Sequence, residues 1–155
     1  MKPVRSILVY RGLAVVALLL ACVPLGPGAE TREIPLPALE VRCRKLEKQQ
    51  SAIQAATRKL HQNVRGQQVL SPGQRQTFQK LAQEEQALVA EAKAIIDLLN
   101  KEGVAVAFTE VFQELRQDMQ RVQQRLEKFD AGPAIQALQQ DILDTLQEMV
   151  DALKK

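Results

Sequence analysis

Few side chains in this sequence could do chemistry, and their spacing does not gather them into a reacting centre. His61 is the sole histidine, so a Ser-His-Asp or Cys-His arrangement would have to use it as the base. Glu110, Glu114 and Asp118 follow at four-residue steps and could share a cation, but they fit more naturally as a solvated ridge near a helix N-terminus. A di-metal helical bundle would need Glu-x-x-His pairs, which one histidine does not supply. We therefore predict no catalytic residue, metal site or cofactor, and expect the protein not to be an enzyme.

The N-terminal segment predicts export. Residues 1–29 contain three basic residues and no acidic one, then an apolar run over 13–21, then a Pro/Gly-rich stretch over 24–29. That is the layout of an export signal. The apolar run is shorter than the roughly 20 residues that a membrane-spanning helix needs. We expect the product to be periplasmic, secreted, or held at a membrane only through a lipid or signal anchor.

Cys22 is the candidate for lipid modification. It ends the segment Leu19-Leu20-Ala21-Cys22, which is similar to a bacterial lipobox, whose cysteine becomes lipid-modified and N-terminal after cleavage. Ordinary cleavage near Gly28 or Ala29 is the alternative, and an uncleaved anchor is the third. Residues 30–37 carry two prolines and are expected to form an extended tether before the folded part.

Charge excludes one class of partner. The three basic residues before position 30 account for the whole net charge of +3, because the remaining 18 Lys and Arg face 18 Asp and Glu. A surface that binds a nucleic-acid duplex needs clustered excess positive charge. The exported form would be neutral, so we expect no nucleic-acid partner.

The rest of the chain has the apolar spacing of packed helices. Residues 108–129 place apolar side chains at alternating steps of four and three, which predicts a coiled-coil seam. Expected helices cover about 38–66, 72–101, 109–130 and 133–154, with a capping box at Ser71-Pro72-Gly73-Gln74 and a cap at Thr109. Matched lengths predict an all-α fold of two antiparallel hairpins over residues 38–155. They close into a four-helix bundle or form an extended coiled coil.

Charged stripes flank these seams and are the candidate interaction residues. On the last helix the acidic members follow steps of three, four and three: Asp141, Asp144, Glu148 and Asp151. Basic counterparts on the first helix are Arg44, Lys45 and Lys48. Flanking charges of this kind select partners in coiled coils, although a plain solvated face has the same pattern. Cys43 stands on the apolar side of the first helix, where it either fills the core or links two copies through a disulfide.

The C-terminal 50 residues or so carry a resemblance. Phe108-Thr109-Glu110-Val111-Phe112, Asp118-Met119 and the segments 141–142 and 148–155 resemble exported bacterial helical proteins of unknown function. The resemblance implies helix packing and brings no site or activity. We expect a non-enzymatic envelope protein that mediates helix-helix interaction, with itself or with another protein. The alternative is a periplasmic chaperone-like or sensor bundle, which binds unfolded chains or a small ligand and would need a contiguous exposed apolar patch.

Overall fold

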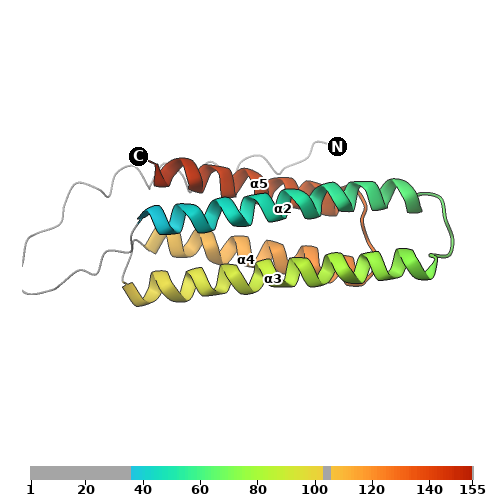
Figure 1. Ribbon diagram of the computed structural model, residues 1–155, viewed down its shortest axis with the longest axis horizontal. Helices are drawn as coiled ribbons and strands as arrows, with labels where there is room; N and C mark the ends of the chain where they lie inside the picture. The colour runs from blue at the N-terminus through green and yellow to red at the C-terminus, as the bar shows by residue number, and fades with distance from the viewer. Residues whose placement is uncertain (1–35, 103–105, 155) are drawn as a thin grey trace, which may run out of the picture. The chain divides into compact units, whose positions relative to one another are not determined.

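The computed structural model describes residues 36–102 and 106–154. These residues form four α-helices and no strand (Figure 1): α2 (Leu36–Val64), α3 (Pro72–Glu102), α4 (Val106–Glu127) and α5 (Pro133–Leu153). All four belong to one unit, Glu33–Lys155. The prediction of an all-α fold is therefore confirmed. The predicted export signal, Cys22 and residues 30–35 of the predicted tether lie outside the described residues.

The four helices pack side by side around a shared apolar core. The most extensive contacts join α3 to α4 and α2 to α5, while narrower contacts join α2 to α3 and α4 to α5. The predicted seam of α4 is buried from Phe112 to Leu126, with each of its five seam residues at most 3% exposed. It belongs to the same core cluster as the seams of the other three helices. The helical periodicity therefore identified the core face correctly.

The connection between α2 and α3 has the glycine turn and the helix cap that the sequence predicts. Gly66, just after α2, has a φ of +81°, a conformation that glycine adopts at little cost. The Gln74 amide N–H donates to Ser71 Oγ at 3.2 Å, and the Ser71 amide N–H donates to Gln74 Oε1 at 2.8 Å. This reciprocal pair is a capping box. The predicted start of α3 at Pro72 is confirmed.

The start of α4 differs from the prediction. The helix begins at Val106, three residues before the cap expected at Thr109. Thr109 lies inside the helix and is only 7% exposed, so its side chain faces the core instead of the helix end. Burial on the same face as Phe112 outweighed the capping preference of threonine. The cap expected at Thr109 is wrong.

The end of α4 is set by Phe129, which the sequence places on the seam. Phe129 has a φ of +59° and is 41% exposed. Its N–H donates to the Leu126 carbonyl at 3.0 Å, and the Asp130 N–H donates to the Arg125 carbonyl at 2.9 Å. These two bonds form a Schellman motif with a phenylalanine where glycine is usual. The helix consequently stops at Glu127, three residues before the expected end.

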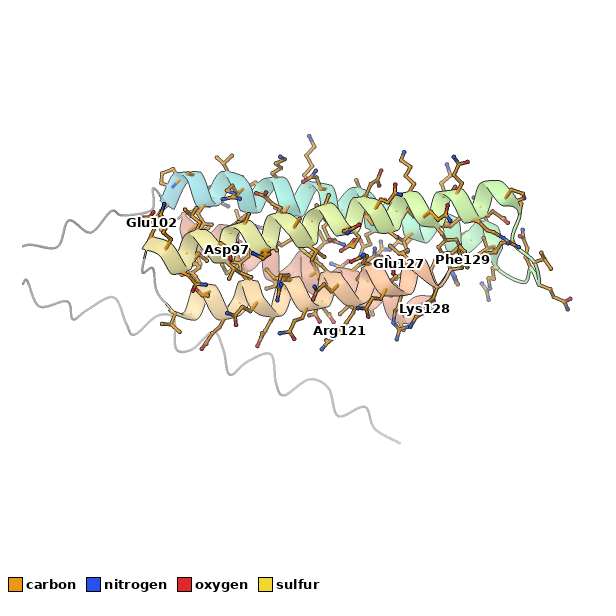
Figure 2. All side chains as sticks on the ribbon, turned by 90° about the horizontal axis from the view of Figure 1, so that it is seen from below. Asp97, Glu102, Arg121, Glu127, Lys128 and Phe129 are labelled. Atoms are coloured by element: carbon orange, nitrogen blue, oxygen red, sulfur yellow. The ribbon has the colours of Figure 1, made fainter. Side chains whose placement is uncertain are left out.

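Phe129 also connects the end of α4 to α3. Its ring meets the ring of Phe78 edge-on, with ring centroids 5.6 Å apart. Figure 2 labels Phe129 near the end of the bundle that is opposite Glu102. Asp130 then accepts bonds from Arg125 and from the N–H of Gly132, both at 2.8 Å. Gly132 precedes Pro133, which occupies the first turn of α5. Residues 128–132 thereby fix how α5 leaves α4.

Candidate functional site

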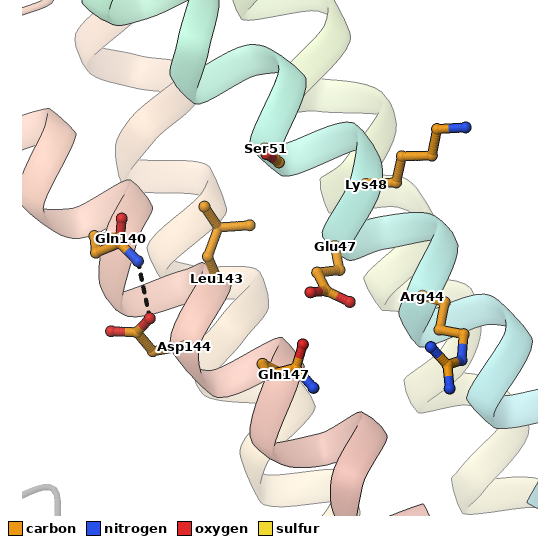
Figure 3. A pocket seen from close by; sticks show the side chains of 8 residues that line it. All are labelled: Arg44, Glu47, Lys48, Ser51, Gln140, Leu143, Asp144 and Gln147. Atoms are coloured by element: carbon orange, nitrogen blue, oxygen red, sulfur yellow. Dashed lines mark hydrogen bonds between the residues drawn. The ribbon is translucent and has the colours of Figure 1, made fainter.

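A groove between α2 and α5 is the candidate interaction site. Its volume is about 550 Å³. In Figure 3, Glu47 of α2 points toward Leu143 and Gln147 of α5, whereas Lys48 points away from α5 into solvent. The lining is mostly polar, and Leu143 is its one large apolar side chain. The lining residues are Arg44, Glu47, Lys48, Ser51, Gln140, Leu143, Asp144 and Gln147. The structure thus brings three sequence-predicted interaction residues, Arg44, Lys48 and Asp144, to one place.

The two helices that form this groove carry opposite charge. Six Lys or Arg and two Glu lie on α2, whereas α5 has four acidic residues and no basic one. By contrast α3 and α4 are nearly balanced, and the α3–α4 side shows charges of both signs (Figure 2). Charge separation is therefore a property of the α2–α5 side of the bundle.

No ion pair crosses the groove between its described residues. Arg44 binds Glu40, one turn earlier on α2, at 2.7 Å. Asp144 Oδ1 accepts a hydrogen bond from Gln140 Nε2 on α5 at 2.9 Å. Arg44 and Asp144 therefore have their partners on their own helix, whereas Lys48 has no ion pair within the described residues and is exposed to a partner.

The other predicted interaction residues lie outside the groove lining. Lys45, Asp141 and Glu148 are exposed on their helices. Asp151 is paired with Lys154 at 2.7 Å. The acidic stripe of α5 thus extends from the groove wall at Asp144 onto the neighbouring solvated surface.

Two buried polar contacts inside the bundle are not predicted by the sequence pattern. Gln50 of α2 donates from Nε2 to Glu85 Oε2 of α3 at 3.2 Å, and both residues are 0% exposed. Gln139 of α5 donates from Nε2 to Thr57 Oγ1 of α2 at 3.2 Å, again with both at 0%. These contacts join α2 to α3 and α2 to α5 at defined levels. Buried polar pairs of this type favour one alignment of helices over others.

Glu85 is the most unusual group in the core. Its burial raises the pKa of the carboxyl group to about 8, against a smaller lowering effect of the bond from Gln50. Glu85 Oε1 and Gln50 Oε1 have no hydrogen-bond partner. A buried carboxylate costs much more free energy than a buried carboxylic acid, so the folded chain favours the protonated form.

A sequence signal for these polar residues did exist. Glu85 stands four residues after Leu81 and three before Leu88, both buried. Gln139 likewise falls between Ile135 and Ile142 at steps of four and three. A strict continuation of the seam predicts burial at both positions, whereas the polarity of the two side chains favours the surface.

The residues that could do chemistry are not assembled by the fold. No group of three or more His, Cys, Asp or Glu in the described ranges is placed to hold a metal ion. Asp118, one of the three carboxylates considered for a cation, accepts a bond from Arg121 at 2.7 Å. Burial raises its pKa, and Arg121 opposes that effect. His61 lies in the last turn of α2.

Cys43 is a core residue. It is 0% exposed and is not in a disulfide. Burial raises the pKa of its thiol to about 11, which the charge of Arg42 only partly offsets. The interpretation of Cys43 as core filling is confirmed.

Comparisons with protein-family models, curated proteins and solved structures gave no match to this chain. None of the helices within residues 36–102 and 106–154 is long and apolar enough to cross a membrane.

Proposed function

We propose that this protein is a non-enzymatic, exported helical protein that binds another protein helix in the cell envelope through its α2–α5 groove. The observation that carries the proposal is the pairing of a basic and an acidic helix on either side of a groove that no ion pair between residues 36–102 and 106–154 crosses. Opposite charges left exposed along two parallel walls give a partner both attraction and orientation.

The proposal includes antiparallel hairpins that close into one bundle. Contacts between Arg42 and Glu91 and between Gln50 and Glu85 support it, since rising numbers on α2 meet falling numbers on α3. At 1.5 Å per residue, a closed bundle would be about 47 Å long, whereas an extended two-part coiled coil would approach about 80 Å. Small-angle X-ray scattering separates these lengths, and the longer one would refute the closed form.

The chaperone-like alternative receives less support. The large exposed apolar side chains among the described residues are five and come from several elements: Leu36 and Val41 lie near the start of α2, Val106 begins α4, and Val69 and Phe129 lie in connections. Binding of unfolded chains calls for a contiguous apolar patch. A polar, charged groove is better suited to a folded helix with complementary charges.

Localisation is tested by the intact mass of the protein from membrane and soluble fractions of a bacterial host that processes export signals. A mass that begins at Cys22 with a lipid adduct supports a tethered lipoprotein. A mass that begins near Ala29 without an adduct supports a soluble periplasmic or secreted protein. An unprocessed protein confined to the cytoplasm contradicts the envelope assignment.

Binding is tested by photo-crosslinking in the same host. A photoreactive phenylalanine analogue is placed at Ser51 in the groove, and at exposed Gln83 on α3 as the matched control. We expect a protein adduct from position 51 and none from position 83. Equal adducts from both positions, or none from position 51, would reject the groove as a binding site.

A further inference from the structure

We propose that the occupant of the α2–α5 groove is a second copy of this chain, docked with α2 of each copy over α5 of the other. This inference rests on the proposed function and names its partner. A face with one basic and one acidic helix side by side can pack against the same face of a second copy. After a two-fold rotation, the basic helix of each copy lies on the acidic helix of the other. Interfaces between identical subunits usually use such self-complementary patches, related by a two-fold axis.

The direction of the two-fold axis follows from the placement of charge. An axis perpendicular to the helices, within the plane of the interface, would lay α2 on α2 and α5 on α5, bringing like charges together. An axis parallel to the groove instead lays basic α2 on acidic α5 twice. Only the second arrangement joins opposite charges, so the two copies should run in the same direction.

The level of the contacts follows from the groove lining. Lys48 and Asp144 line the same groove, and rotation about an axis parallel to the groove does not move a residue along it. The hydrogen bonds from Gln139 to Thr57 and from Gln54 to Gln140 set the register of α2 against α5 and place Lys48 within about one helical turn of Asp144. The extended lysine side chain of one copy therefore reaches Asp144 of the other, and the reverse pair forms by symmetry. Arg44 and Gln147 stand at the next level of the groove, where Arg44 comes within reach of the neighbouring Glu148 of the other copy.

The groups involved are available for this exchange. Lys48 and Glu148 have no ion pair within the described parts of the chain, and both are exposed. On the opposite side each helix carries both signs of charge, with local pairs such as Lys93–Asp97 at 2.6 Å and Arg121–Asp118 at 2.7 Å. The separation of basic and acidic residues onto neighbouring helices, which self-complementarity requires, is thus found between α2 and α5.

Charge reversal with complementation tests the proposal on the processed full chain. Lys48→Glu and Asp144→Lys each create two repulsive contacts in a homodimer, because each contact occurs twice. The dissociation constant, measured by sedimentation equilibrium, should rise at least about tenfold for either variant. Mixing the two variants should restore dimers, because in the mixed dimer the two substituted side chains face each other with opposite charge and the native Lys48 faces the native Asp144.

Two safeguards keep this experiment decisive. Circular dichroism of each variant verifies that the helices are retained, and Lys48→Gln and Asp144→Asn offer milder replacements if either reversal unfolds. Matched controls are Lys80→Glu on α3 and Glu114→Lys on α4, both exposed. The two controls should leave the dissociation constant unchanged.

A monomeric wild type at micromolar concentration, or a mixture that stays monomeric, would overturn the inference. A photo-adduct at position 51 with a different protein would then leave the proposed function standing, whereas no adduct at all would remove both.

Discussion

Replacing Glu85 by glutamine should change how the stability of the protein depends on pH. The pKa of Glu85 in the folded state, about 8, lies well above the ordinary value of 4.5. Between these two pH values the folded chain keeps the Glu85 proton, whereas the unfolded chain has released it. Stability must fall as pH rises through that window, and it levels off above pH 8. At about 1.4 kcal/mol per pKa unit, the loss attributable to Glu85 is roughly 4 to 5 kcal/mol.

The measurement is the free energy of unfolding in urea at a series of pH values from 5 to 9. Wild type should lose stability over this range, whereas Glu85→Gln should lose much less and should be the more stable protein at pH 8. Glu84→Gln is the control, because Glu84 is the adjacent residue with a side chain 44% exposed. Its pH profile should follow that of wild type. If wild type and Glu85→Gln lose stability in parallel, the argument from burial is wrong.

Three further predictions concern other parts of the bundle. Phe129→Ala should be less stable than Phe129→Gly by about 1 kcal/mol in urea unfolding, because both lose the contact with Phe78 and only glycine relieves the positive φ; equal stabilities would argue against strain. Cys43 should resist maleimide in the native state and react after unfolding, as followed by intact mass; rapid native labelling would contradict its burial. Ser71→Ala should cost about 1 kcal/mol and speed amide hydrogen exchange at Gln74, because the capping box is lost; unchanged exchange would show that the cap is unimportant.

Helical periodicity predicted the fold because burial dominates the choice of helix face. The seam from Phe112 to Leu126 and the start of α3 at Ser71-Pro72 could be identified from the sequence. The cap at Thr109 could not, since a residue that favours a helix end was overridden by packing of its side chain. Phe129 adopts a backbone conformation that a phenylalanine rarely has, and no residue pattern announces it.

The candidate site was predicted only in part. Charge spacing pointed to Arg44, Lys48 and Asp144, and the groove lining contains all three. Periodicity gives the face of each helix but not which helices become neighbours, so the groove itself could not be derived. The buried pair Gln50–Glu85 was missed because polar residues at seam positions suggest a weak seam before they suggest a polar contact.

The unequal lengths of the helices bear on where this protein can be modified. Helices α2 and α3 have 29 and 31 residues, whereas α4 and α5 have 22 and 21. In Figure 1 the connection between α2 and α3 projects beyond the connection between α4 and α5. At 1.5 Å per residue the projection amounts to about 12 Å, and Val69 at its tip is 73% exposed. This tip can open without disturbing the four-helix core, so a fluorescent tag inserted between Gln67 and Leu70 should be tolerated and would report on the protein in living cells with the groove left clear.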